Sequence, residues 1–393
     1  MKYNFDEHIN RENTASVKYD LRKEIFGTND VIPMWVADMD FKTPDFIINA
    51  IKERCNHEVF GYSIRPDSYY HSIINWVKKL HNWDIKKEWI SFSPGVVPAL
   101  NLLVLALTEK GDKIVLQTPV YHPFFYAINN NNRQLIENPL IFKKGRYCFD
   151  FDDLAIKLKD AKILLLSNPQ NPGGSVWTRD ELKKLGNLCI ENNVIIVSDE
   201  IHSDLVFKPH KFVPMASISD AIANITITCI APSKTFNMAA LSTSSVIISN
   251  KELKEKYDKI LDTIHVGLGN VFGTVASEAA YTHGYEWLQQ LLVYLKENID
   301  FAENYFKEKI PQIKMIRPEG TYLVWLDCRE LNMSGNELNQ FFIEKAKIGL
   351  NKGSMFGTNG EGFLRMNVAC QKSILEKALQ NIENAVKEKY NRN

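Results

Sequence analysis

Four short apolar runs, separated by segments of helical pattern, constrain the fold of this chain more than any other feature. The runs are residues 112–117, 161–167, 193–199 and 224–230. Continuous apolar runs of this kind are typical of strands in a parallel sheet that helices cover on both faces. Residues 178–193 have a helical repeat and open with Thr178 and a nearby Glu181, which is a helix-capping pattern. The alternation predicts an α/β domain with a doubly wound, mainly parallel sheet.

The pattern changes after residue 285. The expected elements are a long helix at 285–310, strands at 315–328 and 362–370, and a final helix at 373–390. We therefore expect a smaller α+β domain, joined by the N-terminal arm of the chain. A length of 393 residues suits one large domain and one smaller one. The predicted domains are residues 45–285, and residues 1–44 together with 286–393.

Composition argues against several classes of function. Lys plus Arg (47) balances Asp plus Glu (47), so no basic field favours nucleic acid or an anionic membrane. The N-terminus is polar, and the longest apolar runs are far too short to span a bilayer. The six cysteines stand singly, and the nine histidines show no metal-ligand spacing. We expect a cytoplasmic protein with reduced thiols and no metal.

Lys234 is the residue that least fits its surroundings. It lies between the strand predicted at 224–230 and another run of small and apolar residues. A buried lysine is costly, so its amine either turns to solvent or performs chemistry. Polar groups also follow other predicted strands: Asn171 follows one and Asp199 closes another, while Gly95 lies in a turn before a helix that begins near Pro98. Open α/β sheets bind ligands at this edge.

Each of these signals has an ordinary explanation when taken alone. Asp199 could cap the next helix, and Asn171 could simply form a turn. Together with Lys234 they meet the requirements of pyridoxal phosphate: an amine to form an imine, a carboxylate for the pyridine nitrogen and an amide for the phenolic oxygen. The helix start after Gly95 could hold the phosphate. The chain has no Walker-type loop, no GxGxxG after a strand and no HExxH.

The order of these motifs resembles that of a known enzyme family. The motifs are "SPGVV", "TPVYHPF", "SNPQNPGG", "SDEIHSD", "APSKTFN" and "GFLRMN". Nearly the whole chain resembles the fold-type I pyridoxal-phosphate enzymes of aminotransferase class I/II. This resemblance implies the aspartate aminotransferase fold. "WVADMDF", "QTPVYHPFF" and "EGTYLVWLDCR" are typical of the MalY/PatB-type carbon–sulfur lyases, the cystathionine β-lyase-like branch.

The resemblance implies roles for the residues at the cofactor ring. Lys234 would form the Schiff base and shuttle the proton, and burial would lower its pKa from about 10.4. Asp199 would pair with the pyridinium nitrogen, and Asn171 and His202 would face the phenolic oxygen. Tyr121 would stack on the ring.

The resemblance also implies a phosphate site, a substrate site and a dimer. The phosphate would be surrounded by Gly95, Val96, Val97 and Ser233. Arg365 would grip the substrate carboxylate, for which a guanidinium is suited, although a strand-face salt bridge is its ordinary explanation. Ala37 would lie beside the substrate. Tyr62 would reach the phosphate of a partner subunit in a homodimer, unless it is an ordinary core aromatic residue.

Three departures from the family pattern bear on the substrate. Aspartate-type aminotransferases carry a phosphate-binding arginine eight residues after the lysine, where this chain has Ser242. That difference favours the lyase branch. The histidine and later arginine of the lyases' asparagine loop are replaced by Gln170 and Ser175, and the proline–arginine pair after the final strand is replaced by Gln371 and Lys372. These changes leave the substrate open.

Three functions are therefore considered. The preferred one is α,β-elimination from L-cystathionine or a related sulfur amino acid, giving pyruvate, ammonia and a thiol. The second is an aminotransferase acting on an α-amino acid and a 2-oxo acid, because the early chemistry is shared. The third is a regulatory protein that binds a protein partner, a role known within the family.

Overall fold

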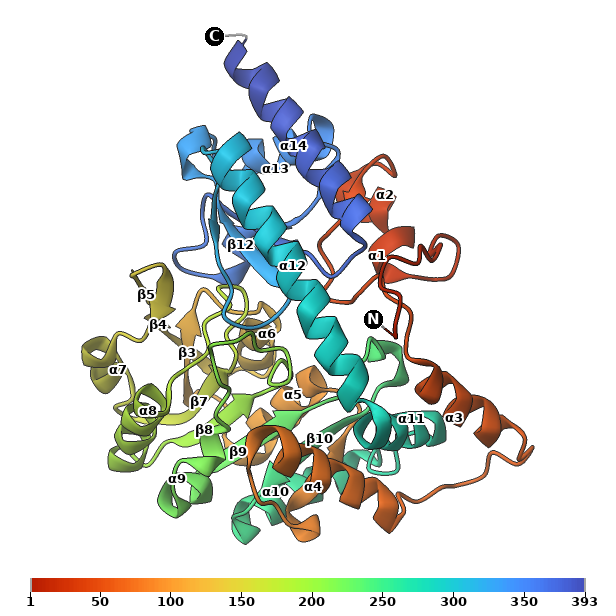
Figure 1. Cartoon of the computed structure of the whole chain (residues 1–393). Helices are drawn as coiled ribbons and strands as arrows, with labels where there is room; N and C mark the ends of the chain where they lie inside the picture. Colours follow the sequence, from red (N-terminus) through yellow and green to blue (C-terminus); the bar gives the residue numbers. More distant parts are fainter. Residues whose placement is uncertain (1, 392–393) are drawn as a thin grey trace.

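A seven-stranded sheet forms the centre of the larger part of the molecule in the computed structural model, which describes residues 2–391 (Figure 1). Its strands are β2 (Ile90–Ser93), β3 (Lys113–Thr118), β4 (Gln134–Pro139), β7 (Ala161–Ser167), β8 (Ile195–Asp199), β9 (Thr226–Ile230) and β10 (Ser244–Ile248). They are arranged in the order β2-β10-β9-β8-β7-β3-β4. The neighbours β9, β8, β7, β3 and β4 run parallel, whereas β10 is antiparallel to both β2 and β9. The predicted mainly parallel sheet is confirmed.

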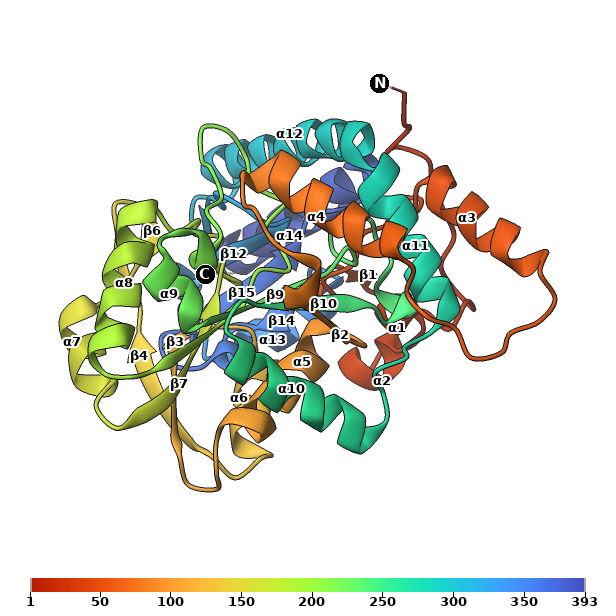
Figure 2. The same ribbon diagram turned by 90° about the horizontal axis from the view of Figure 1, so that it is seen from below.

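Helices cover both faces of this sheet (Figure 2). One layer consists of α5 (Val96–Leu107), α6 (Pro123–Asn129) and α10 (Lys251–Ile264), and the other includes α7 (Phe151–Lys157), α8 (Arg179–Glu191) and α9 (Asp220–Asn224). The sequence of β7 is continuously apolar because both faces of the strand are buried. Ile163 packs in the core beneath the first helix layer, and the adjacent Leu164 packs in the core beneath the second helix layer. The predicted capping box at the start of α8, formed by Thr178 and Glu181, is present.

A second, antiparallel sheet lies in the upper part of Figure 1. Its strands, in spatial order, are β11 (Lys314–Ile316), β12 (Leu323–Asp327), β15 (Phe363–Asn367) and β14 (Asn351–Lys352). The accompanying helices are α12 (Tyr285–Lys309), α13 (Gly335–Glu344) and α14 (Lys372–Asn391). Residues 315–328 were expected to form one strand, which is wrong. They contain parts of two antiparallel strands, because Pro318 and Gly320 lie in the turn between them.

The N-terminal arm lies beside this second sheet. It contains α1 (Val17–Asp20), α2 (Arg22–Phe26) and β1 (Ile32–Pro33), and β1 pairs in parallel with β13 (Ile348–Gly349). Helices α3 (Asp45–Cys55), α4 (Asp67–His81) and α11 (Val271–His283) pack together beside the larger sheet. The remaining strands, β5 (Ile141–Lys143) and β6 (Arg146–Cys148), form a hairpin. Short 3₁₀ helices span Lys87–Trp89, Met215–Ser217, Ala239–Leu241, Arg329–Leu331 and Gly353–Phe356.

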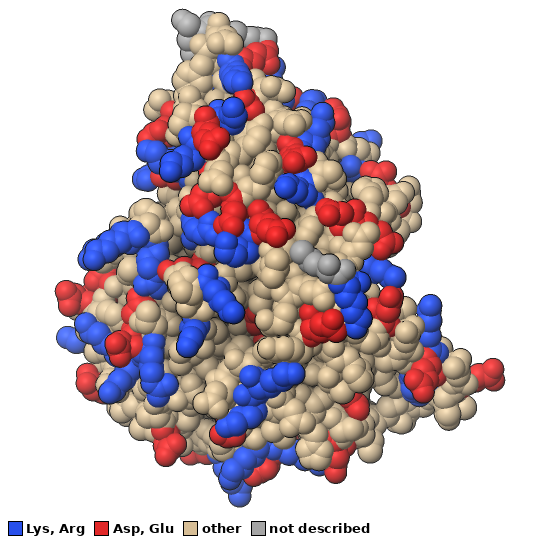
Figure 3. Space-filling model, in the orientation of Figure 1, with Lys and Arg blue, Asp and Glu red and all other residues tan. Residues whose placement is uncertain are grey.

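Basic and acidic side chains are interspersed over the face shown in Figure 3, with no continuous patch of one sign. Within residues 2–391, no group of three or more His, Cys, Asp or Glu side chains could hold a metal ion. Nor does that part of the chain contain a helix with the length and apolar character needed to cross a membrane.

The register of the larger sheet places the chemistry-bearing residues along one edge. Ser167 is paired with Asp199, and Asp199 is paired with Cys229. Because these strands are parallel, the loops that follow them leave the sheet on the same side. Asn171, Asp199 and Lys234 therefore belong to one edge, as the sequence predicts.

Candidate active site

Lys234 lies in a turn directly after β9. The turn is closed by hydrogen bonds from Phe236 N to Pro232 O and from Met238 N to Ser233 O. The Lys234 amine is partly buried and donates a hydrogen bond of 2.6 Å to the carbonyl of Ala37. Burial lowers the pKa of Lys234 to about 8, because a charged amine loses its hydration there. A useful fraction of the amine is therefore neutral near neutral pH.

Three charged groups also act on the Lys234 amine. Arg365 lowers its pKa further, whereas Asp38 and Asp199 raise it. These side chains come from strand β15, the N-terminal arm and strand β8 respectively. Three segments that are distant in sequence thus meet at this lysine, and Ala37, predicted to lie beside the substrate, is in direct contact with it.

Asp199 ends β8 and is buried. Its Oδ1 accepts a hydrogen bond of 3.1 Å from Ile201 N, and among residues 2–391 it forms no ion pair with a basic side chain. Burial raises its pKa to about 6, opposed by the Ile201 hydrogen bond and the Lys234 charge. The helix-cap explanation is wrong, because a turn follows Asp199 rather than a helix. The carboxylate is placed to receive a cationic donor.

Arg365 lies on β15 and is 3% exposed. Its guanidinium donates to three neutral acceptors: Asn171 Oδ1 (3.1 Å), Asn351 Oδ1 (2.7 Å) and Trp35 O (2.9 Å). Its Nε is buried and, within residues 2–391, has no hydrogen-bond partner. Burial lowers its pKa to about 10, since no carboxylate in the described part of the chain pairs with it. The salt-bridge explanation is therefore wrong, and the site is suited to an incoming carboxylate.

Three of the residues expected at the cofactor ring lie around this pair of charges. Because a guanidinium can only donate, its contact fixes Asn171 Oδ1 as the acceptor and leaves Nδ2 as a donor. His202 is buried, and its Nδ1 lacks a hydrogen-bond partner among the described residues. Burial lowers its pKa to about 3, with the charges of Lys234 and Arg365 adding to the effect. Tyr121 is partly buried after β3, where burial raises its pKa, Arg365 lowers it and Asp199 raises it.

The expected phosphate site lies where β2 joins α5. Gly95 is the N-cap residue of this twelve-residue helix, and no side chain within residues 2–391 caps it. Val96 and Val97 occupy the first turn, where backbone N–H groups are left to bind an anion. Ser233 is partly buried one residue before Lys234. No hydrogen bond joins Ser233 to Gly95, Val96 or Val97 in residues 2–391, so the structure places the two parts at one edge without linking them.

Tyr62 is not brought to this site within one chain. It is 98% exposed, in the segment 56–66 that loops away from the body between α3 and α4 (Figures 1 and 2). The explanation of Tyr62 as an ordinary core aromatic residue is therefore wrong.

The structure adds residues that the sequence reading did not single out. The buried hydroxyl of Tyr322 donates to the Ala37 carbonyl at 2.9 Å, so this oxygen has two donors. Asn351 holds Arg365, and Asp38 acts on Lys234. Tyr322 and Asp38 lie within motifs that carry the family resemblance, which was the available signal. Asn351 occupies a two-residue strand, where no sequence pattern marks it.

Two of the departures from the family pattern have structural roles. Gln170 closes its own loop: its Oε1 accepts from Gly173 N, and its Nε2 donates to the carbonyl of Pro119. Gln371 donates to the carbonyls of Glu7 and Asp40 and so attaches the N-terminal arm. Neither side chain carries a charge that could select a substrate.

The residues present fit pyridoxal phosphate. Asp199 is a buried carboxylate without a counter-ion among the described residues, and His202 Nδ1 is a buried atom without a partner. Lys234 supplies an amine whose pKa is lowered, and α5 supplies an N-terminus that no side chain in the described part of the chain caps. These are the groups that a pyridine nitrogen, an aldehyde and a phosphate require.

Comparison with known proteins places this site in a family. The chain is 44% identical to cystathionine beta-lyase PatB of Bacillus subtilis (strain 168), over 98% of this chain and 100% of the relative. Its structure matches that of cystalysin from Treponema denticola, which contains pyridoxal 5′-phosphate, with a TM-score of 0.96, 37% identity, and coverage of 99% of this chain and 100% of the other. It also matches the PLP-bound C–S lyase from Staphylococcus hominis, with a TM-score of 0.90, 35% identity and coverage of 98% of both chains.

The family model for aminotransferase class I and II matches residues 29–382. That range holds all of the site residues named above. The chain therefore belongs to the aminotransferase class I and II family and is similar over almost its full length to cystathionine beta-lyase PatB and to protein MalY of Escherichia coli (strain K12).

Proposed function

We propose that this protein is a pyridoxal-phosphate-dependent carbon–sulfur β-lyase. It acts on L-cystathionine or a related sulfur amino acid and gives pyruvate, ammonia and a thiol. The observation that carries the proposal is Lys234, a partly buried amine with a pKa lowered to about 8, whose charge interacts with the Asp199 carboxylate and the Arg365 guanidinium. Neither of these two groups has a counter-ion among residues 2–391. The 44% identity to a cystathionine beta-lyase over almost the full length supports the lyase assignment.

Eight residues of the same chain would hold the cofactor besides Lys234. When bound, pyridoxal phosphate supplies an aldehyde carbon for amines and a ring that takes up the electron pair released at the substrate α-carbon. Asp199 would keep the ring nitrogen protonated, Asn171 Nδ2 and His202 would face the phenolic oxygen, and Tyr121 would stack on the ring. The phosphate would lie against Gly95, Val96, Val97 and Ser233.

Arg365 would orient the amino acid by its α-carboxylate. Its guanidinium is buried among neutral acceptors, and its Nε has no hydrogen-bond partner among residues 2–391, so a carboxylate would satisfy both the charge and the Nε. With the carboxylate held there, the substrate α-proton would be transferred to the Nζ of Lys234. An amine with a pKa of about 8 can both accept and return a proton near neutral pH. Ala37 would lie beside the substrate.

An aminotransferase is the second candidate, because the family model itself describes aminotransferases. The same residues would serve both reactions. An end-point assay with cystathionine, with and without 2-oxoglutarate, distinguishes them. Pyruvate and thiol formed without the oxo acid support the lyase, whereas glutamate formed only with the oxo acid would refute it. A regulatory protein partner stays a prediction, to be tested by pull-down with holoprotein and cofactor-free protein.

We also propose a homodimer in which Tyr62 reaches the cofactor phosphate of the partner subunit. The segment around it exposes a row of apolar side chains, namely Val59, Phe60, Tyr62 and Ile64. Such a row on an extended loop is expected where another chain covers it. The cytoplasmic location and the domain limits, 45–285 and 1–44 with 286–393, stay predictions.

A further inference from the structure

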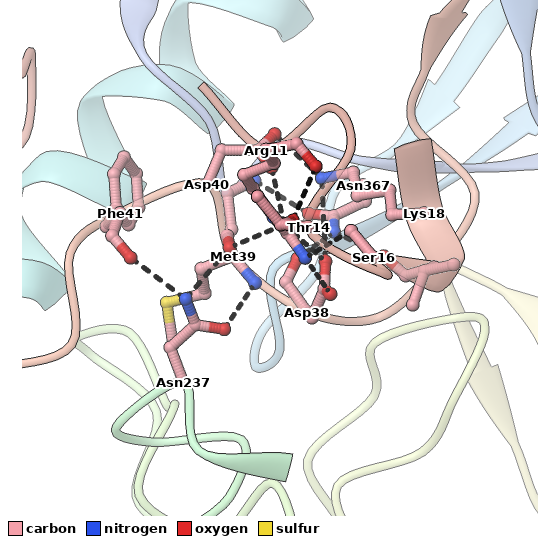
Figure 4. Close-up of polar contacts among 12 residues, drawn as sticks. Arg11, Thr14, Ser16, Lys18, Asp38, Met39, Asp40, Phe41, Asn237 and Asn367 are labelled. Carbon is pink, nitrogen blue, oxygen red and sulfur yellow. Dashed lines mark hydrogen bonds and ion pairs between the residues drawn. The ribbon is translucent and has the colours of Figure 1, made fainter. Parts of the chain in front are cut away.

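Residues 37–41 form a short irregular segment that the Lys234 turn holds through Asn237 (Figure 4). The Oδ1 of Asn237 accepts from Met39 N at 3.0 Å, and its Nδ2 donates to the carbonyls of Met39 and Phe41, both at 2.9 Å. Asn237 is only three residues after Lys234 and has a left-handed backbone (φ 55°), which asparagine tolerates better than most residues. The turn that carries the lysine therefore also fixes this segment.

Two cations of the N-terminal arm hold the same segment by its carboxylates. Arg11 binds both oxygens of Asp38, at 2.6 and 3.1 Å, and also contacts Asp40 at 2.7 Å. Lys18, which is 1% exposed, pairs with Asp40 at 2.7 Å. Figure 4 shows the four charged side chains converging on one side of the segment. Two cations and two anions balance, so the cluster carries no net charge while every member is present.

The Ala37 carbonyl is the end of the segment that faces the site. The side chain of Asn367 donates to the carbonyls on either side of it, those of Val36 (2.7 Å) and Asp38 (2.5 Å). With its neighbours held in this way, the Ala37 carbonyl points to Lys234 Nζ and receives its hydrogen bond. The direction of this one acceptor thus depends on contacts made several residues away.

We propose that Arg11 and Asn237 are positioning residues that fix residues 37–41, so that the Ala37 carbonyl receives the Lys234 amine whenever that nitrogen is not bonded to the cofactor. This inference rests on the proposed function of Lys234. A lysine that leaves and rejoins the cofactor in each cycle needs a defined resting position, and a fixed acceptor supplies one without a covalent bond.

The two residues act on the Lys234 proton in opposite directions. The charged groups around the amine are Asp38 from the arm, Asp199 from β8 and Arg365 from β15, with His202 nearby. Arg11 neutralises Asp38, so removing Arg11 would strengthen the field that keeps the amine protonated. Asn237 keeps the Ala37 carbonyl in place, and a lost acceptor would favour the neutral amine.

The test measures how the Lys234 amine of cofactor-free protein reacts with trace acetic anhydride as pH varies, by mass spectrometry of its peptide. The variants are Arg11→Gln and Asn237→Gly, the latter chosen because glycine keeps the left-handed backbone without strain. The matched control is Arg22→Gln. Like Arg11, Arg22 stacks on Tyr19, but it pairs with Glu12 and not with residues 37–41.

Arg11→Gln should shift the midpoint of Lys234 labelling upward by about one pH unit, so that labelling below the midpoint falls ~10-fold. Asn237→Gly should shift it downward and speed hydrogen exchange at Met39 N, while Arg22→Gln should do neither. Faster exchange at Met39 N in Arg11→Gln as well, together with the downward midpoint shift in Asn237→Gly, supports the proposal, because both residues then hold the segment that carries the Ala37 carbonyl. Normal exchange at Met39 N in Arg11→Gln, or an unchanged midpoint in Asn237→Gly, would overturn it.

If Arg11→Gln does not fold, Arg11→Lys is the substitute variant. It keeps the positive charge but loses the two-pronged contact with Asp38, so hydrogen exchange at Met39 N should be faster while the midpoint of Lys234 labelling stays nearly normal. An unchanged exchange rate there counts against the proposal. Because labelling needs neither cofactor nor turnover, failure of the lyase assignment would appear in the cystathionine assay alone.

Discussion

Arg365 donates a hydrogen bond of 3.1 Å to Asn171 Oδ1 and so joins a strand of the smaller sheet to a loop at the edge of the larger one. The two sheets are thereby connected through the residues expected to hold the substrate carboxylate and the phenolic oxygen of the cofactor. A substrate that draws Arg365 toward its carboxylate would also act on the orientation of Asn171. The contact makes Arg365 the first residue to test.

Replacing Arg365 by lysine should keep the charge and lose the two-pronged contact. We expect KM for the amino acid to rise about 10- to 100-fold, because a hydrogen bond to a charged group contributes ~1.5–3 kcal/mol. Steady-state kinetics would measure it. The control is Arg329→Lys, at an exposed arginine that pairs with Asp327 on the same sheet. An unaltered KM in Arg365→Lys would remove the carboxylate role.

Lys234 should carry the cofactor. Reduction of the loaded protein with borohydride should fix the pyridoxyl group to Lys234, as peptide mapping can establish. Lys18 is a demanding internal control because it is also buried. The Lys18 amine forms an ion pair with Asp40, which favours its charged, unreactive form, so Lys18 should stay unmodified. A pyridoxyl group on any other lysine would contradict the assignment.

The sequence predicted the larger sheet well because its strands are buried on both faces. Such strands are continuously apolar, and β7 matches the predicted residues 161–167 at both ends. The smaller sheet was harder to predict. Its strands are short, and β11 and β12 are separated by a turn within one apolar stretch, so the boundary is set by pairing rather than by hydrophobic pattern.

The candidate site was predictable where chemistry coincides with the end of a strand. Asp199 and Lys234 stand out because a charged residue follows an apolar run. Asn351 and the Arg11 cluster were missed, because their roles depend on contacts between segments far apart in the chain. No local sequence pattern marks the ion pair between Arg11 and Asp38, because the two residues are far apart along the chain. Only the fold brings such pairs together.

Tyr62 should act across a dimer interface. Mixing Tyr62→Phe and Lys234→Ala subunits would form heterodimers with one intact site and one doubly altered site. Activity should then partly return, provided that each homodimer is impaired. Tyr390→Phe, at a partly exposed tyrosine of α14, should remain active by itself. If confirmed heterodimers show no recovery, Tyr62 serves its own subunit's site.

Asp199→Asn should remove most turnover and keep the fold. The amide has almost the shape of the carboxylate but cannot hold the ring nitrogen protonated, so electron uptake by the ring weakens. We expect kcat to fall by two or more orders of magnitude, since each ~1.4 kcal/mol of lost stabilisation is tenfold in rate. Single-turnover kinetics with cystathionine would measure it. A variant with normal turnover would exclude the electrostatic role.

The same variant should be the more stable protein when the cofactor is absent. Burial raises the Asp199 pKa from 3.8 to about 6, so its contribution to stability is present below the unfolded value and lost as pH rises through about 6. Cofactor-free Asp199→Asn should therefore match the parent near pH 4 and exceed it by a few kcal/mol near pH 8, at ~1.4 kcal/mol for each pH unit between the two values.

Denaturant unfolding of both cofactor-free proteins at several pH values would test this difference. Burial also raises the pKa of Glu200 to about 8, so ionisation of Glu200 lowers the stability of both proteins as pH rises. Only the difference in stability between the two proteins therefore reports on Asp199. Adding pyridoxal phosphate should reduce or reverse the gap, because the cofactor stabilises the form that binds it and Asp199 gives it a counter-ion. Parallel stability curves across the whole pH range would mean that Asp199 is ionised at no cost. That result would contradict the view that the Asp199 carboxylate is destabilised until the cofactor supplies a positive charge.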